Sequence, residues 1–156
     1  MMRSGDPYDV LVIGGGLAGL SAAHHAALRG LSVASLDDGG HMGGLVMNVG
    51  RIDGYAAAGA VSGIDLSAAQ LEAIVELGVE IVPDRGAGLT LDGGIVAVTT
   101  GSGVHRAKTV VLASGARLKS LGVPGEQALF GRGVSQCADC DAGFFVDQKI
   151  VVVGGG

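Results

Sequence analysis

The stretch that decides the fold is "VLVIGGGLAGLSAA", residues 10–23. An apolar run ends abruptly in three glycines, and apolar residues at helical spacing follow. This order predicts a buried strand over residues 8–13, a tight turn, and a helix over residues 17–29 that stops at Gly30. A second apolar run at residues 32–36 completes a strand–helix–strand unit, whose two strands should be parallel neighbours.

The glycine-rich turn between that strand and helix matches the GxGxxG pattern of dinucleotide-binding proteins. The first glycine permits the tight turn, the second lets the backbone approach a pyrophosphate, and the third lets helix and strand pack closely. The N–H groups at the start of the helix then offer partial positive charge to the phosphates. We therefore predict a cofactor-binding turn composed of Gly14, Gly15, Gly16, Leu17, Ala18 and Gly19.

Two acidic residues follow the second expected strand. Asp37 stands about 20 residues beyond the glycine turn, where an acid accepts hydrogen bonds from the ribose hydroxyls of a bound adenosine. Asp38 is the competing candidate. The alternative is a glycine-rich turn without a ligand, but strand, helix and acid together favour dinucleotide binding.

The rest of the chain predicts a mixture of helix and strand. Asp65 is the expected cap of the second helix, and glycine pairs separate the short strands of an antiparallel meander. The expected elements are, in order, a long functional loop at 39–63, a helix at 65–77, a strand at 79–82, the meander at 86–106, and buried strands at 109–113 and 149–153.

Composition and charge exclude several classes of partner. Apolar residues make up 48% of the chain and aromatic residues only 3%, with 30 glycines, which suits close backbone packing around a ligand. The net charge of −5 argues against binding nucleic acid or an anionic membrane. The uncharged stretch from Val10 to Leu28 is divided by glycines and histidines, so we expect no membrane span. Asp6 and Asp9 offset Arg3 ahead of this stretch, so we expect no secretory signal and a cytoplasmic location.

The only two cysteines, Cys137 and Cys140, form a CxxC pattern. A zinc site normally takes four ligands, and neither a second CxxC nor a suitably spaced histidine pair is present. A structural disulfide across so short a loop would restrict the unfolded chain little. A dithiol that cycles with its disulfide is the favoured interpretation. Asp141 is a candidate acid or base for thiol exchange, although its spacing alone favours a turn or cap residue.

Five motifs, in this order and spacing, resemble the low-molecular-weight thioredoxin reductase family of flavin and pyridine-nucleotide disulfide oxidoreductases. They are the opening stretch, "VVLASGA" at 110–116, "LGVPGE" at 121–126, "GRGVSQCADCDAGFF" at 131–145 and "KIVVVGGG" at 149–156. The resemblance implies an α/β protein: a Rossmann-like FAD-binding fold with a parallel sheet and a small antiparallel β-meander, truncated at the start of a second dinucleotide-binding domain. Residues 1–117 would form the N-terminal part of the FAD-binding domain. Residues 118–156 would hold the redox CxxC segment and the first strand of the NADPH-binding domain.

The resemblance also implies roles for individual residues. The glycine turn would bind the FAD pyrophosphate, and Asp37 the adenosine ribose. Cys140 would face the flavin, Cys137 would attack the disulfide of a partner, and Asp141 would serve both sulfurs as an acid. The remaining cofactor contacts would be Gly43, Gly44, Ser114, Gly115 and Ala116 for FAD, with Gly154 and Gly156 for NADPH.

The activity implied is electron transfer from NADPH to FAD, then to the cysteine pair, then to the disulfide of a small thioredoxin-like protein, in a homodimer when full length. The chain departs from the family pattern at Leu17, where Pro is common, at Leu45, where Gln is usual, and at "IDGYAA" (52–57), which replaces an ENYPG-like turn. These departures motivate a first alternative, a flavin-dependent dithiol oxidase that acts on a small molecule with oxygen as acceptor. A second alternative is a non-catalytic truncated fragment, because the glycines at 154–156 have no helix after them.

Overall fold

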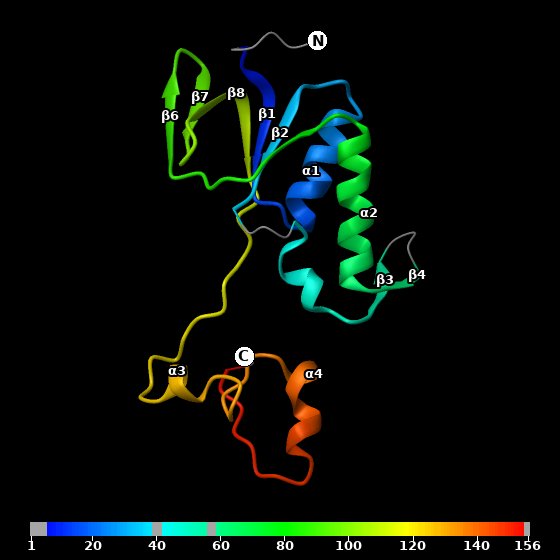
Figure 1. Ribbon diagram of the computed structural model, residues 1–156, viewed down its shortest axis with the longest axis vertical. Coiled ribbons are helices and arrows are strands. Elements are labelled where there is room, and N and C mark those ends of the chain that lie inside the picture. The colour runs from blue at the N-terminus through cyan, green and yellow to red at the C-terminus, as the bar shows by residue number, and fades with distance from the viewer. Residues whose placement is uncertain (1–5, 39–41, 56–58, 155–156) are drawn as a thin grey trace. The chain divides into compact units, whose positions relative to one another are not determined.

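The computed structural model describes residues 6–38, 42–55 and 59–154. The chain divides into two compact units, Met1–Gly115 and Ala116–Gly156. The first unit contains a six-stranded sheet, a separate two-stranded ribbon and two long helices (Figure 1). The second unit contains short helical turns and irregular chain.

Four strands of the large sheet run parallel, and the glycine-rich turn lies at the end of the central one. The sheet has the order β5-β2-β1-β8-β7-β6. β1 pairs with β2 on one side and with β8 on the other, both in parallel register. The expected strand–helix–strand unit is therefore confirmed. These strands are β1 (Tyr8–Ile13), β2 (Val33–Leu36), β5 (Glu80–Val82) and β8 (Val104–Leu112).

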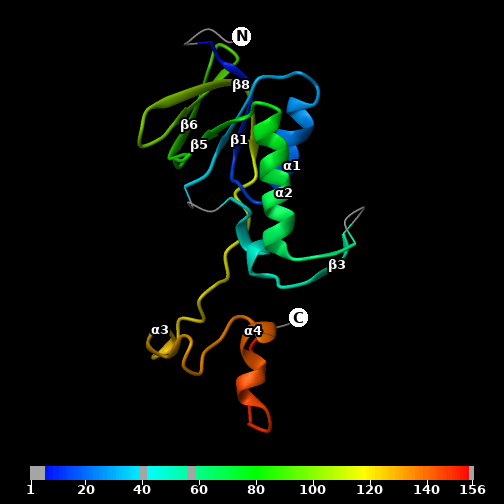
Figure 2. The ribbon, with the colours of Figure 1, turned by 45° about the vertical axis from the view of Figure 1, so that its right-hand side comes forward.

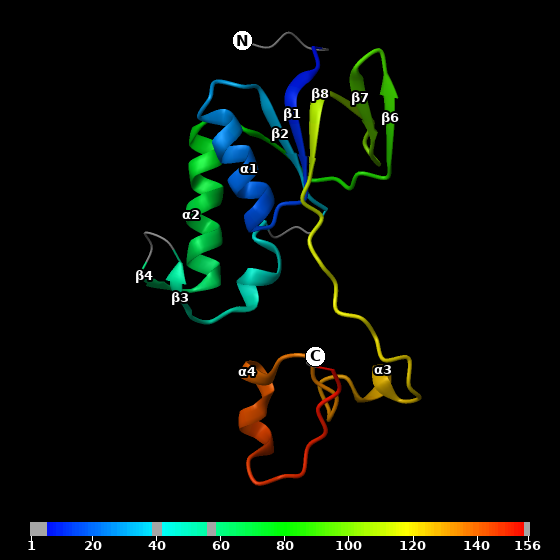
Figure 3. The same cartoon turned by 180° about the vertical axis from the view of Figure 1, so that it is seen from behind.

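Two helices cover one face of the parallel strands. α1 (Leu17–Ala27) and α2 (Gly63–Glu76) lie side by side on that face, as Figures 1 and 3 show from opposite directions. Successive strand residues point to opposite faces, so alternate residues of β1 pack against these helices. The core between helices and sheet consists of Val10, Val12, Leu20, Ala23, Val33, Ile74 and Val79.

The antiparallel meander supplies apolar side chains to a second core cluster. It is built from β6 (Gly88–Asp92), β7 (Ile95–Thr99) and the first residues of β8. Figure 2 shows the meander on the side of β1 away from the helices. This cluster takes the alternate residue of β1, and its members are Leu11, Ala34, Leu36, Val82, Val98 and Ala107.

The strand expected at 109–113 is not a separate element. Residues 104–107 pair antiparallel with β7, and residues 107–112 continue as the parallel neighbour of β1. β8 can pair with both β7 and β1 because each edge of a strand can hydrogen-bond to a different neighbour. The meander and the parallel sheet are thereby joined without a turn.

The prediction of a long loop at 39–63 without regular structure is wrong for most of the described part. The structure places there η1 (Gly44–Asn48), β3 (Ile52–Tyr55) and β4 (Gly59–Val61), with β3 and β4 paired antiparallel. Residues 39–41 and 56–58 lie outside the described residues. η1 packs closely against the start of α2, where a Cβ on Gly63 would lie only 1.7 Å from the carbonyl oxygen of Val46.

The cap of α2 also differs from the prediction. Ser62, not Asp65, is the N-cap, and its hydroxyl oxygen accepts a hydrogen bond from the Asp65 N–H at 3.0 Å. The Ser62 hydroxyl in turn donates to the Asp65 carboxylate at 2.6 Å. This reciprocal pair resembles a capping box and starts the helix two residues before the expected first residue.

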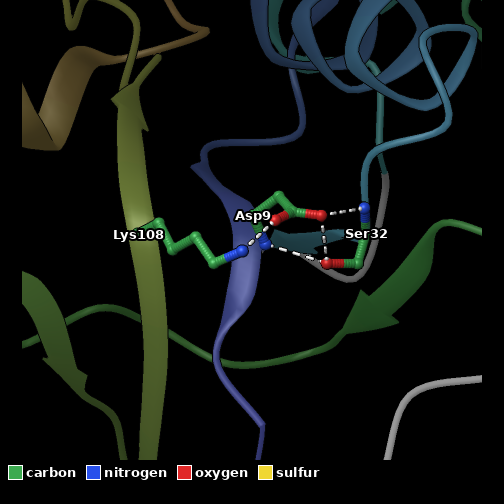
Figure 4. A network of polar contacts seen from close by, with 3 residues as sticks. All are labelled: Asp9, Ser32 and Lys108. Carbon is green, nitrogen blue, oxygen red and sulfur yellow. Dashed lines mark hydrogen bonds and ion pairs between the residues drawn. The ribbon is translucent and has the colours of Figure 1, made fainter.

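A small polar network links two neighbouring strands of the sheet and the residue before a third (Figure 4). Asp9 on β1 accepts hydrogen bonds from the Lys108 ammonium of β8 at 2.7 Å, and from the Ser32 N–H and hydroxyl at 2.9 Å each. The Lys108 hydrogen bond, followed by those from Ser32, lowers the pKa of Asp9 to about 2. The network joins β1 to β8 and to the residue that precedes β2.

In the second unit, a buried carboxylate fixes the turn that precedes the first short helix. Glu126, 8% exposed, accepts hydrogen bonds from the Ser120 hydroxyl and from the N–H groups of Leu121 and Gly122 at 2.6–2.9 Å. The Ser120 hydrogen bond is the largest cause of a lowered Glu126 pKa. The short elements of this unit are α3 (Glu126–Leu129), α4 (Ala138–Asp141) and η2 (Ala142–Phe145).

The strand expected at 149–153 does not form. Residues 149–154 are irregular, and the side chains of Val151 and Val152 are 88% and 79% exposed. A strand requires a neighbour for its N–H and C=O groups, and no strand within the described residues pairs with this segment. Among those same residues, no helix has both the length and the apolar character to cross a membrane.

Candidate functional site

The glycine-rich turn is built so closely that two of its residues cannot carry a side chain. Gly14 has a φ of +110°, and a Cβ there would lie 2.2 Å from the carbonyl oxygen of Ala113. A Cβ on Gly19 would lie 1.8 Å from the carbonyl oxygen of Gly14. The turn therefore packs closely against Ala113, the residue after β8, and against the first turn of α1. These are the close contacts that the first and third glycines of the pattern permit.

A Cβ on Gly16, in contrast, would make only ordinary van der Waals contacts. The nearest atom to a Cβ on Gly16 would be the Gly43 carbonyl oxygen, 3.9 Å away. Gly16 is also the N-cap of α1, and it makes no side-chain cap hydrogen bond. The first N–H groups of a helix have no partner within the helix. At this turn they are therefore placed, together with the positive end of the helix dipole, to bind an anion beside Leu17 and Ala18.

Asp37 lies against the glycine turn. Its carboxylate accepts a hydrogen bond from the Gly15 N–H at 2.5 Å. Its own N–H donates to the carbonyl oxygen of Val82 at the end of β5, at 3.2 Å. The carboxylate stands at the carboxyl ends of β1, β2 and β5, where open α/β sheets bind ligands.

Asp38 is exposed and forms an ion pair, with 3.6 Å between its carboxylate and the Nε atom of Arg85. Sequence reasoning missed Arg85, because it stands 47 residues away from Asp38 in the chain. No local pattern marks the pair. Only the pairing of β2 with β5 brings the two residues together.

A second pair of glycines packs on the turn. The Gly43 N–H donates to the Gly15 carbonyl oxygen at 2.7 Å, and a Cβ on Gly44 would lie 3.0 Å from the Gly16 Cα. Both glycines have positive φ angles, +139° and +67°. The structure therefore brings Gly43 and Gly44 to the predicted cofactor site, with their backbones forming part of its wall.

The residues after β8 border the turn only in part. The Ala113 N–H donates to the Ile13 carbonyl oxygen at 2.8 Å, and a Cβ on Gly14 would lie 3.2 Å from the Ser114 nitrogen. Gly115 follows with a φ of +70°. Ala116 is the first residue of the second unit.

The two cysteines form a disulfide in the second unit. Cys137 is the N-cap of α4, and its sulfur, bonded to that of Cys140 at 2.05 Å, accepts a hydrogen bond from the Cys140 N–H at 3.2 Å. Cys140 is exposed, whereas Cys137 and Asp141 are half-buried. The Asp141 N–H donates to the Cys137 carbonyl oxygen at 3.1 Å. This disulfide is accessible, and it is chemically competent for exchange with a thiol.

The two glycines predicted to begin a nicotinamide-nucleotide site are not both described. Gly154 is exposed and has a φ of +96°. Gly156 lies outside the described residues. The prediction for this pair therefore stays a prediction.

Comparison with known proteins places these features in one family. A family model described as pyridine nucleotide-disulphide oxidoreductase matches residues 8–156. The chain belongs to this family. Within the family, the thioredoxin reductase of Streptomyces clavuligerus is 40% identical over 153 residues, which cover 97% of this chain and 48% of the relative.

Two solved structures of the family resemble this fold. The thioredoxin reductase of Lactococcus lactis matches with a TM-score of 0.78 and 34% identity, covering 88% of this chain and 45% of that one. A ferredoxin-flavin thioredoxin reductase from Clostridium acetobutylicum matches with a TM-score of 0.67 and 30% identity, covering 90% of this chain and 48% of that one. The chain thus spans about half the length of the relatives that it matches.

Proposed function

We propose that the protein is an FAD-dependent dithiol/disulfide oxidoreductase that reduces the disulfide of a thioredoxin-like protein with electrons from NADPH. The observation that carries the proposal is an accessible CxxC disulfide in a chain whose other unit has the glycine turn of a dinucleotide site. The family match and the named thioredoxin reductases support it. We further propose that the full-length protein is a cytoplasmic homodimer, as the resemblance to this family implies.

The residues of the glycine turn fit the pyrophosphate of FAD. Gly16 has no side chain that would separate its backbone from a phosphate, and Gly43 and Gly44 pack beside it. The uncapped start of α1 would donate N–H groups to the phosphates, which compensates for the acidic net charge. Asp37 would accept hydrogen bonds from the ribose hydroxyls. When bound, FAD would supply the chemistry that converts a hydride from NADPH into an electron pair for a disulfide.

The cysteine pair would carry that electron pair to the substrate. Two electrons and two protons convert the Cys137–Cys140 disulfide into two thiols. The Cys137 thiolate then attacks one sulfur of the partner disulfide and displaces the other as a thiolate, which forms a mixed disulfide. Cys140 attacks the Cys137 sulfur, which restores the original disulfide and releases the reduced partner. Asp141 would exchange protons with the two sulfurs.

A trapping experiment tests the exchange step on this chain. The Cys140→Ser variant, reduced and freed of reductant, should form a mixed disulfide that is visible on a non-reducing gel. Its partner is a thioredoxin whose resolving cysteine is replaced by serine and whose other cysteine carries a thionitrobenzoate leaving group. The matched Cys137→Ser variant should trap little, because its remaining thiol is the resolving one. Equal trapping by both variants, or by neither, would contradict the proposed roles.

The electron donor is the step for which an alternative has support. The alternative is a flavin-dependent dithiol oxidase, and it is supported by the departure of this chain from the usual family pattern at residues 45–57. Anaerobic addition of NADPH to the FAD-loaded protein tests the donor directly. Bleaching of the flavin absorbance supports NADPH. Absence of bleaching, together with oxygen uptake driven by a small dithiol in a separate aerobic assay, supports the dithiol oxidase.

A further inference from the structure

The loop after β5 is fixed in place by a carboxylate. Asp84 accepts hydrogen bonds from the Arg85 N–H at 2.7 Å, the Ser102 N–H at 2.7 Å and the Gly101 N–H at 3.2 Å. The Ser102 hydroxyl donates to the same carboxylate, and its hydrogen bond is the largest cause of a strongly lowered Asp84 pKa. The Ala87 N–H donates to the Thr99 carbonyl oxygen at 2.8 Å. The backbone that carries Arg85 is therefore tied to the β7–β8 turn.

The fixed loop presents Arg85 to the acidic end of β2. β2 and β5 are parallel neighbours, so Asp38 and Arg85 both lie at the carboxyl ends of these strands. Their ion pair measures 3.6 Å, and both side chains are more than half exposed. The preceding residue, Asp37, is hydrogen-bonded to the glycine turn. Asp38 is therefore adjacent in sequence to Asp37, whose carboxylate contacts the glycine turn that we propose to bind phosphate.

Two adjacent carboxylates create an electrostatic problem at such a site. Asp37 has a use there, because it can accept hydrogen bonds from a ribose. A second negative charge from Asp38 would repel a pyrophosphate over several ångströms, and repulsion over that range is only partly screened at low salt. A cation beside Asp38 removes this repulsion without touching the ligand.

We infer that Arg85 is a charge-compensating residue of the dinucleotide site, which promotes FAD binding by neutralising Asp38. The inference rests on the proposed function, because it presumes that the glycine turn binds the FAD pyrophosphate. Arg85 acts through Asp38, so it is a positioning residue and not a catalytic one. Its effect depends on the presence of the Asp38 charge, which makes the inference testable by a double-mutant cycle.

The experiment measures the dissociation constant of FAD by quenching of flavin fluorescence. The proteins are wild type, Arg85→Gln, Asp38→Asn, the double variant, and Arg29→Gln. Arg29 lies past the end of α1 that is opposite the glycine turn, and it donates to the His25 carbonyl oxygen. Arg29→Gln is therefore the control variant: it removes one positive charge, as Arg85→Gln does, but far from the turn. Urea unfolding of each variant verifies that the fold is retained.

At low salt, Arg85→Gln should weaken FAD binding about two- to five-fold, as expected for a charge interaction through solvent. The double variant should return to the wild-type constant, and Arg29→Gln should not differ from wild type. At about 0.5 M salt the effect of Arg85→Gln should largely disappear, because the screening length shortens.

Two results overturn the inference: no effect of Arg85→Gln, or a loss that Asp38→Asn does not restore. The second result would indicate direct contact of Arg85 with the ligand or a structural role. Absence of FAD binding by the wild-type chain is a different result. It overturns the dinucleotide site itself, and with it the inference.

Discussion

Replacement of Gly19 by Ala tests the packing that shapes the glycine turn. The new Cβ would lie 1.8 Å from the Gly14 carbonyl oxygen, and backbone atoms cannot move aside as a flexible side chain can. To reach 3.0 Å from that oxygen, α1 would have to recede from β1 by about 1.2 Å. That shift would loosen Leu20 and Ala23, which are fully buried between helix and sheet.

The magnitude follows from two opposing effects. Overpacking of a tight contact costs up to about 3 kcal/mol, and replacing a glycine with alanine in a helix gains at most about 1 kcal/mol. We expect a net loss of about 2 kcal/mol in the free energy of unfolding, measured as a lower urea midpoint at an unchanged slope. FAD binding should weaken as well, since the displaced helix carries the N–H donors.

Gly88→Ala is the matched control for this variant. Gly88 lies on the edge strand β6, a Cβ there would meet no neighbouring atom within 4 Å, and its φ is not positive. Its urea midpoint should change little, within about 0.5 kcal/mol of wild type. If Gly19→Ala proved as stable as Gly88→Ala, the close helix–strand contact would not be the reason for the third glycine.

Three further predictions concern local contacts. Ser62→Ala should lower the free energy of unfolding by about 1 kcal/mol in urea, because the α2 cap is lost, and Ser62→Thr should retain most of it. Asp9 has its pKa lowered to about 2, so its contribution is present above about pH 4 and lost as the pH falls through 2. The stability advantage of wild type over Asp9→Asn should therefore vanish across that range in acid unfolding experiments. Burial, followed by the Glu80 hydrogen bond, raises the pKa of Tyr8 to about 12. The contribution of Tyr8 to stability is complete below about pH 10 and is lost as the pH rises through 12. In pH titrations that follow tyrosinate absorbance, the difference between wild type and Tyr8→Phe reports Tyr8, and it should have its midpoint near 12. A midpoint near 10 would contradict the partial burial of Tyr8 and its hydrogen bond to Glu80.

Local patterns were sufficient for the elements whose partners are close in sequence. β1, α1 and β2 follow one another directly, and their apolar periods and terminal glycines predict both their type and their pairing. The helix cap was missed although a signal was present, since Ser62 and Asp65 have the three-residue spacing of a capping box. The strand predicted at 149–153 fails for the opposite reason: its residues favour a strand, but a strand needs a neighbour.

The residues of the candidate site also fall into two groups, those marked by local sequence patterns and those brought together only by folding. The glycine turn, Asp37 and the CxxC pair could be named from the sequence, because each depends on residue types at fixed short spacings. Arg85 could not be named, because its relation to Asp38 arises only when β2 and β5 pair. The same holds for the contact of Gly43 and Gly44 with the turn, which depends on how the segment after β2 returns to it.

By itself, the sequence determined that this chain has a dinucleotide-type strand–turn–helix and a pair of cysteines suited to redox exchange. These features are encoded by backbone freedom at glycine and by the chemistry of neighbouring side chains, both of which act over a few residues. The tertiary structure alone decided that β8 joins two kinds of sheet, and that a cation faces the acidic end of β2. Such relations depend on which strand edges meet, and that choice is made by the burial of the whole core and not by any local stretch.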